Sequence, residues 1–320
     1  MLPNNKKLSI LYTLQILKDY TDENNLLTQN EIANKLYSIY GMQVERKTIG
    51  SNVDQLIDFG FDIVKTKNGC FLFGREFEPT EIQFLVDAVF SSPSISGKQA
   101  KQLATKISSL LSVYKRGKYN YIYKAEELNR TNNKELFYNI EILNEAIENK
   151  KQVQFEYDKV GNTKSDYIIN PYCLINRMGR YYLVCNNNNF NRVSNYKVER
   201  IKNIKILNGK AKPITKIPGF ENGLDIAKYA NENIYMFSSK AINATLKLKN
   251  ENSFNYVDDW FGKRAKLFNK KDEIFVNLVA NEKSLIFWCL QYGEEVELVE
   301  PKLTREIIKK MIENLSKKYK

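Results

Sequence analysis

The chain has 320 residues, of which 43% are hydrophobic and 27% are charged, as expected for a globular protein of two or three domains. It contains no histidine, which excludes Ser-His and Cys-His catalysis and metal binding through imidazole. Its net charge of +12 favours contact with a polyanion, and the excess lies in the middle of the chain, where residues 136–212 carry thirteen cations against seven anions.

Residues 1–76 begin with three predicted helices, each marked by apolar residues at helical spacing. Thr28 and Glu31 have the spacing of a capping box, which indicates the start of the second helix. The helices are predicted around residues 10–17, 28–40 and 45–59.

A predicted β-hairpin follows the third helix. Apolar residues in 61–65 and 70–73 indicate two short strands, and Asn68-Gly69 between them is a strong hairpin turn signal. Three helices followed by a two-stranded hairpin are typical of a winged helix-turn-helix, whose third helix enters the major groove of DNA while the hairpin contacts the backbone. A second interpretation is a helical protein-interaction domain with a solvated polar face.

The candidate DNA contacts are polar side chains on the third helix, on the hairpin and at the start of the second helix, where backbone N–H groups favour phosphate. Residues 1–78 carry nine cations against ten anions, so nonspecific affinity is expected to be modest unless charge is concentrated locally and doubled by dimerisation. The candidate residues are Thr28, Gln29, Arg46, Lys47, Thr48, Ser51, Asn52, Lys65 and Lys67.

Residues 77–135 are predicted to be a helical connector. Helices are expected at about 79–89 and 96–113, separated by the helix-breaking sequence Ser91–Ser94. The cations of residues 115–118 precede Tyr119, Tyr121 and Tyr123, a mixture that suits either a nucleic-acid surface or a linker whose tyrosines pack on neighbouring domains.

Residues 136–212 are predicted to contain one helix and a small antiparallel β unit, because short alternating segments follow an amphipathic stretch. The helix is expected at 136–149 and the strands at 153–157, 167–174, 181–185, 196–198 and 201–206. Cations flank the strands, and alternation places Arg180 and Tyr182 together on one face.

These side chains form a candidate anion-binding surface on which tyrosines stack against bases. The alternative is that Arg200 pairs with Glu199 or Glu156 and that the other cations are a solvated face. The candidate ligand-binding residues are Tyr172, Arg177, Arg180, Tyr182, Arg192, Lys197 and Arg200.

The rest of the chain is predicted to be a linker, residues 213–233, and an α+β domain, residues 234–320. The linker contains Pro213, Pro218 and Gly219. In the domain, strands are expected at 241–248, 273–278 and 295–299, helices at 254–261, 284–292 and 301–315, and Trp260 and Trp288 in the core.

Three parts of the sequence resemble the WYL-domain transcriptional regulators. Tyr181-Tyr182-Leu183 is similar to the Trp-Tyr-Leu motif of that family, with Tyr in place of Trp, and 196–201 is similar to its aromatic-Arg-Leu-Asp-Arg-Ile strand end, with Lys for Arg and Glu for Asp. The third helix matches the recognition-helix pattern at Thr48, Ile49, Leu56 and Gly60, although Ser51-Asn52 replaces the family's Arg-Asp. Residues 285–307 resemble the C-terminal extension of these regulators.

The resemblance implies a multidomain α+β fold: a winged helix-turn-helix, a helical connector, a small Sm-like β-barrel (WYL) and a ferredoxin-like C-terminal (WCX-like) domain. It also implies a homodimer whose sensor responds to a small anionic ligand or a short nucleic acid. We therefore expect a transcriptional regulator that binds double-stranded DNA, with single-stranded nucleic acid or a nucleotide as effector. The alternative is an RNA-binding protein that uses the Sm-like domain and has a protein-contact module at the N-terminus.

An enzyme is not expected, because the sequence has no Gly-rich phosphate loop and no clustered acidic motif, although Asp258-Asp259 and Glu294-Glu295 supply adjacent carboxylates. No cofactor or metal is expected. The four cysteines are scattered without a CxxC pair and are predicted to be reduced and buried. No membrane segment or signal peptide is apparent, so a cytoplasmic location is expected.

Overall fold

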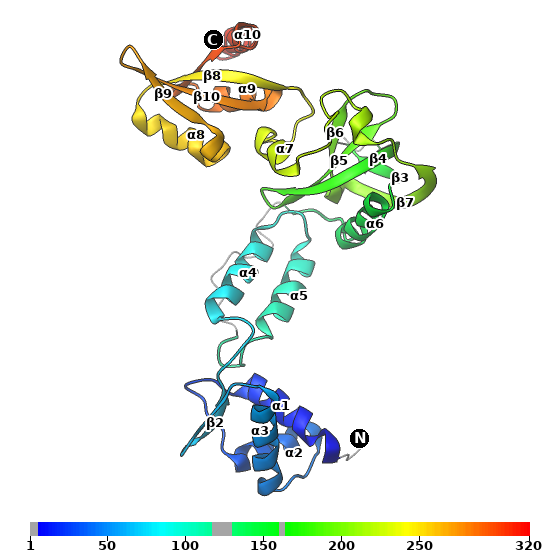
Figure 1. Cartoon of the computed structure of the whole chain (residues 1–320), viewed down its shortest axis with the longest axis vertical. Coiled ribbons are helices and arrows are strands. Elements are labelled where there is room, and N and C mark those ends of the chain that lie inside the picture. The colour runs from blue at the N-terminus through cyan, green and yellow to red at the C-terminus, as the bar shows by residue number, and fades with distance from the viewer. Residues whose placement is uncertain (1–5, 117–129, 160–163) are drawn as a thin grey trace. The chain divides into compact units, whose positions relative to one another are not determined.

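The computed structural model describes residues 6–116, 130–159 and 164–320 (Figure 1). The chain divides into two compact units, residues 1–132 and 133–320. The mixed α+β class predicted from the sequence is confirmed. Tyr119, Tyr121, Tyr123 and the turn expected at Gly161 lie outside the described residues.

The first unit opens with a short 3-10 turn, Lys6–Leu8, followed by helices α1 (Ser9–Tyr20), α2 (Gln29–Tyr40) and α3 (Arg46–Phe59). Their apolar stripes meet in one core whose centre includes the fully buried Ile16, Ile32 and Ile49. The predicted capping box is present, since Thr28 accepts from the backbone N–H of Glu31 and the Glu31 carboxylate accepts from that of Thr28. Sequence periodicity therefore located these helices correctly.

The hairpin after α3 consists of the antiparallel strands β1 (Ile63–Thr66) and β2 (Gly69–Leu72). It is fixed to the segment before α2, because Leu27 and Cys70 exchange backbone hydrogen bonds of 2.9 and 3.0 Å. A Cβ atom at Gly69 would lie 2.7 Å from the Leu27 carbonyl, so only glycine fits this approach. The hairpin is thus held at the N-terminal end of α2.

Helices α4 (Pro79–Ser91) and α5 (Gly97–Ser108) pack against each other through a small core that includes Ile82, Val86 and Ala104. The Arg130 guanidinium donates to the carbonyl oxygens of Ser92 and Ile95 and so holds the loop between the helices. Helix α5 ends five residues before the predicted boundary at residue 113.

The second unit begins with helix α6 (Leu136–Glu148), which is followed by one antiparallel sheet. The sheet has the order β6-β5-β4-β3-β7. Its strands are β3 (Lys151–Asp158), β4 (Lys164–Arg177), β5 (Arg180–Asn187), β6 (Val193–Lys197) and β7 (Ile201–Lys210), and the 3-10 turn Val198–Arg200 joins the last two.

This sheet is strongly curled. The Tyr196 ring on β6 lies 5.6 Å from that of Phe155 and 5.0 Å from that of Tyr157, both on β3, although two strands separate β6 from β3 in the sheet. Within the described residues no ladder joins β6 to β7, so the sheet is curled but not closed by hydrogen bonds. The closed barrel expected from the family resemblance is therefore not observed.

A second apolar cluster covers the opposite face of β4 and β5. Cys173, Ile175 and Val184 of the sheet pack against Ile217 and Tyr229. The last two come from the segment predicted as a linker, which forms the 3-10 turn Ile214–Lys216 and helix α7 (Ile226–Glu232). Much of this segment is thus anchored on the sheet.

The C-terminal part has a βαββαβ order followed by a final helix, with a sheet of antiparallel strands in the order β11-β8-β10-β9 (Figure 1). Helices α8 and α9 pack on one face of this sheet around the fully buried Trp288. Trp260 packs against this core partly buried. The elements are β8 (Ala241–Leu248), α8 (Phe254–Phe261), β9 (Lys266–Lys270), β10 (Glu273–Asn281), α9 (Glu282–Gln291), β11 (Val296–Glu300) and α10 (Lys302–Lys318).

Candidate nucleic-acid and ligand interfaces

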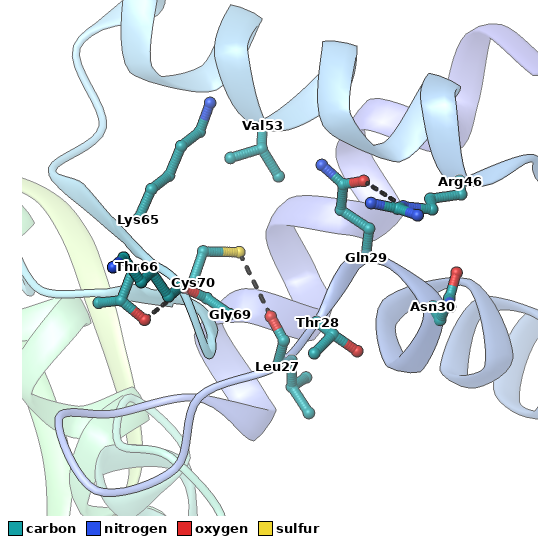
Figure 2. A pocket seen from close by; sticks show the side chains of 11 residues that line it. Leu27, Thr28, Gln29, Asn30, Arg46, Val53, Lys65, Thr66, Gly69 and Cys70 are labelled. Atoms are coloured by element: carbon teal, nitrogen blue, oxygen red, sulfur yellow. Dashed lines mark hydrogen bonds between the residues drawn. The ribbon is translucent and has the colours of Figure 1, made fainter.

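A groove of about 380 Å³ lies between the start of α2, the start of α3 and the hairpin (Figure 2). Lys65 of β1 stands at one end and Arg46 of α3 at the other. More than half of the predicted DNA contacts line it: Thr28, Gln29, Arg46, Lys65 and Lys67. Residues far apart in the sequence thus meet on one surface.

The wall of the groove near α3 is fixed by close packing. The Arg46 Nε donates to the Gln29 Oε1 at 3.0 Å, as the dashed line in Figure 2 shows. A Cβ atom at Gly50 would lie 2.9 Å from the Gln29 amide nitrogen, so a side chain at this position would displace the Gln29 amide. These contacts orient the Arg46 guanidinium before any ligand arrives.

Two more predicted contacts, Lys47 and Ser51, line a shallow hollow on the exposed side of α3 together with Gln29 and Arg46. Thr48 is also exposed on α3 but lines neither the groove nor this hollow. The backbone N–H of Thr28, one of the predicted phosphate donors, already donates to the Glu31 carboxylate at 2.7 Å. A phosphate there would have to replace that bond.

The prediction that Asn52 faces DNA is wrong. Its side chain is only 6% exposed, and its amide donates to the hydroxyls of Ser9 and Thr13 on α1. Asn52 lies one turn from Ile49 and beside Val53 on the buried side of α3, where a polar group is retained because it has partners. It joins α3 to α1.

Carboxylates temper the positive charge of this surface. Lys65 forms an ion pair with Asp54 of α3, and both side chains are well exposed, at 46% and 61%. Glu45 also lies beside Arg46 in the hollow. Exposed pairs of this kind are weak, so a phosphate can compete for Lys65 at little cost.

A second set of cations gathers where β5, β6 and the turn Val198–Arg200 meet, and we call it the WYL cluster: Tyr157, Arg180, Tyr182, Lys197, Glu199 and Arg200. The Arg180 Nη1 lies 2.5 Å from the Glu199 Oε1, and the Glu199 side chain is only 4% exposed. Lys197 is the register partner of Tyr182, and its backbone N–H donates to the Tyr157 hydroxyl at 3.2 Å.

The positive charges of the WYL cluster disfavour one another. Burial lowers the pKa of Lys197, and the nearby Arg180 and Arg200 lower it further, while Glu199 offsets part of the effect. Burial also raises the pKa of Tyr182 and of Tyr157, so both hydroxyls stay protonated as hydrogen-bond donors. One carboxylate against three cations leaves a net positive, partly desolvated site that suits an anion.

Three predicted ligand contacts lie at the edge of this cluster or beyond it. Arg177 faces Arg180 across the β4–β5 hairpin. Arg192 stacks over the Phe190 ring at 5.2 Å, in the loop beyond the other end of β5. Tyr172 lies near Cys185 at that same end, and burial raises the pKa of its hydroxyl.

The structure corrects two expectations about this face. Arg180, rather than Arg200, is the partner of Glu199. Tyr182 does not stand on an open surface, because it packs against the apolar cluster that Ile217 and Tyr229 build over β4 and β5. Sequence alternation gave the correct strand but did not reveal this cover.

The four cysteines are free and buried, as predicted. Burial raises the pKa of Cys173 to about 11, so its thiol is a poor nucleophile. In residues 6–116, 130–159 and 164–320, no group of three or more acidic or cysteine side chains is arranged to hold a metal ion. None of the helices in this part of the chain combines the length and hydropathy needed to cross a bilayer.

Together these features define a multidomain α+β protein with cation-lined surfaces in both of its units. Residues 138–206, which contain most of the WYL cluster's sheet, match the family model of the WYL domain. The chain therefore contains a WYL domain, and the resemblance seen in the motifs of this segment is confirmed.

Two solved structures are similar to the chain at low identity. Proteasome accessory factor B/C (PafBC) of Arthrobacter aurescens is 14% identical with a TM-score of 0.30, and the match covers 97% of this chain and 48% of PafBC. The chain thus spans about half the length of PafBC. A CRISPR Cas-related protein is 15% identical with a TM-score of 0.41, and the match covers 97% of this chain and 84% of that protein. No curated protein matches the chain.

Proposed function

We propose that this protein is a DNA-binding transcriptional regulator whose affinity for its promoter changes when an anionic ligand binds the WYL cluster. The observation that carries the proposal is the convergence of Arg180, Lys197 and Arg200 on one buried carboxylate within the WYL domain. Such a site binds anions but lacks the nucleophile and the adjacent general base of a hydrolase. We therefore also propose that the protein is not an enzyme.

The N-terminal residues 1–76 are proposed to act as a winged helix-turn-helix. Helix order, the hairpin after α3 and the groove shared by Arg46 and Lys65 support this role. In this arrangement α3 enters the major groove through Lys47, Thr48 and Ser51, and the hairpin contacts the backbone. The protein is proposed to act as a homodimer, because two-fold operators favour paired recognition helices.

The WYL domain, residues 136–212, is proposed to be Sm-like. One helix precedes the sheet, and the rings of Phe155, Tyr157 and Tyr196 meet inside its curl. Residues 77–135 would then connect sensor and DNA-binding domain. Residues 234–320 are proposed to be a ferredoxin-like, WCX-type extension, because their βαββαβ order and antiparallel sheet have that topology.

The effector is proposed to be a short single-stranded nucleic acid or a nucleotide. A phosphate would interact with the guanidinium groups of Arg180 and Arg200 and relieve the repulsion that lowers the pKa of Lys197. A base has the hydroxyls of Tyr182 and Tyr157 close by for hydrogen bonding. Lys197 supplies a point charge rather than the two parallel hydrogen bonds of an arginine. The cluster therefore selects for negative charge rather than for one particular phosphate geometry.

Binding of the purified protein to its own upstream DNA, measured in graded salt with and without a short single-stranded oligonucleotide, tests the proposal. We expect salt-sensitive, sequence-preferring duplex binding that the oligonucleotide changes. Absence of duplex binding together with tight binding of single strands or RNA would instead favour an RNA-binding protein with an N-terminal protein-contact module.

A further inference from the structure

The sheet of the C-terminal part leaves one face open. Along β10 the side chains of Ile274, Val276 and Leu278 point into the core formed with α8 and α9, whereas the alternate residues point away from it. The same alternation holds along β8. Both helices contribute to the same core, so neither covers the other face, on which Ala241 and Val279 at one end border a groove under α7.

Two phenyl rings stack on this open face. Phe268 of β9 and Phe275 of β10 are register partners, and their ring centroids lie 5.5 Å apart with 20° between the planes. Phe268 is 36% exposed. Folding places most large apolar side chains inside, so a stacked aromatic pair on the solvent side of a sheet offers a stacking surface to a ligand.

The segment around Phe268 is rich in cations. Residues 263–271 contain five lysines and arginines and no carboxylate, and all five are exposed: Lys263, Arg264, Lys266, Lys270 and Lys271. Lys266 and Lys270 share the face of Phe268, two residues to either side of it on the strand. Within the part of the chain that the structure describes, neither forms an ion pair.

The neighbouring rows of the face are polar. Lys247 of β8 is the register partner of Phe275 and pairs with Glu273 at 2.5 Å. In the next row the Thr245 hydroxyl donates to the Asn277 side chain at 2.8 Å, which leaves the Asn277 amide nitrogen available as a donor. The face therefore combines stacking surface, positive charge and hydrogen-bonding groups.

We propose that this open face binds a single-stranded nucleic acid, whose bases stack on Phe268 and Phe275 while Lys266, Lys270 and Lys247 contact its phosphates. Aromatic stacking and a basic track are the two requirements for binding single strands. Lysines on an edge strand also prevent strands of other molecules from pairing with it, but that role does not require stacked rings on the face.

The far end of the face limits the path of the bound nucleic acid. There, Ala241 and Val279 border a groove of about 630 Å³ under the segment 218–232. Glu221, Asp225 and Glu232 line that groove against the two cations Lys228 and Lys240, and the net negative charge disfavours phosphate. The nucleic acid is therefore placed at the β9 end of the face, over the phenyl rings. The inference does not depend on the proposed regulatory function.

The test measures binding of fluorescent U12 and dT12 to the full chain by anisotropy. All proteins carry Arg180→Ala with Arg200→Ala, so that the WYL cluster does not bind the probes. We expect Phe268→Ala with Phe275→Ala to weaken binding of the preferred probe by roughly 10- to 100-fold. Leu267→Ala, which removes a more exposed apolar side chain from the other face of the same strand, is expected to bind as the parent does.

A second variant, which changes charge only, tests the same face if the aromatic variant does not fold. Lys266→Gln with Lys270→Gln alters only exposed side chains, and we expect the slope of log affinity against log salt to become shallower by roughly 1.4, at about 0.7 per phosphate contact. Preference for U12 over dT12, or the reverse, identifies RNA or DNA as the ligand. Failure of the parent to bind either probe, or equal binding by the aromatic and lysine variants and the parent, overturns the inference.

Discussion

The groove of the N-terminal domain and the WYL cluster both gather cations, but their ion pairs differ in solvent exposure. In the groove, Lys65 pairs with Asp54 while both side chains remain well exposed. In the WYL cluster, Arg180 pairs with a Glu199 side chain that is only 4% exposed. Ion pairs in water are cheap to exchange, whereas a buried carboxylate among cations is costly to disturb. The first surface suits reversible contact with many phosphates, and the second suits one specific anion.

The largest effect is expected at the buried carboxylate. Glu199→Gln leaves Arg180, Lys197 and Arg200 without their counter-charge, so we expect the free energy of unfolding in urea to fall by about 2 kcal/mol. Millimolar phosphate should restore part of that loss. The matched control is Glu297→Gln, because Glu297 and its partner Arg305 are each 51% exposed. We expect this change to lower the free energy of unfolding by less than about 1 kcal/mol. Equal losses in the two variants would remove the contrast between the two surfaces.

A smaller effect is expected in the groove. Arg46→Ala should weaken duplex binding by about fivefold to tenfold and lower the salt slope by about one, because one oriented phosphate contact is lost. Binding of DNA duplexes in a salt series measures both quantities. Lys18→Ala removes an exposed cation of α1 outside the groove and should change neither. Unchanged duplex binding by the Arg46 variant would separate the groove from DNA.

Removing the Asp54 partner of Lys65 is expected to strengthen duplex binding rather than weaken it. Asp54→Asn frees Lys65 for phosphate, so we expect duplex affinity to rise by about twofold to fourfold and the salt dependence to steepen. Asp58→Asn removes an equal charge one turn further along α3, outside the groove, and serves as the control. Weaker duplex binding after Asp54→Asn would show that Lys65 does not face DNA.

The smallest effect is a gain in stability. Since burial and, to a smaller extent, the neighbouring cations lower the pKa of Lys197, Lys197→Met should raise the free energy of unfolding by a few tenths of a kcal/mol, after allowance for solvent screening. The folded protein holds this proton less tightly than the unfolded chain, so wild-type stability should rise with pH between the lowered pKa and 10.5, and this rise should be absent from the variant. A pH series of urea unfolding curves checks the sign.

Sequence patterns predicted the local structure well where contacts are local. The helices of the first domain follow from apolar spacing, and the capping box at Thr28 and Glu31 was confirmed. Strand β9 was missed because all of its residues are exposed, so Lys266–Lys270 shows no alternation of buried and polar positions.

Misplaced site residues depended on partners remote in the sequence. Asn52 is buried because Ser9 and Thr13 lie across from it, and Tyr182 is covered because α7 folds back onto β4 and β5. Neither partner can be inferred from the residues around these positions. The choice of Arg180 rather than Arg200 for Glu199 depends on the turn Val198–Arg200, whose 3-10 geometry the sequence did not indicate.

In the proposed mechanism the WYL cluster controls duplex binding through an anion. The most direct measurement compares the effect of a short single-stranded oligonucleotide on promoter binding for wild type, for Arg180→Ala with Arg200→Ala, and for Lys205→Ala with Lys210→Ala, which removes the same charge from exposed positions on β7. We expect wild type and the Lys variant to respond alike, and the Arg variant to bind duplex normally without responding. An equal response in all three proteins would show that the WYL cluster does not control duplex binding.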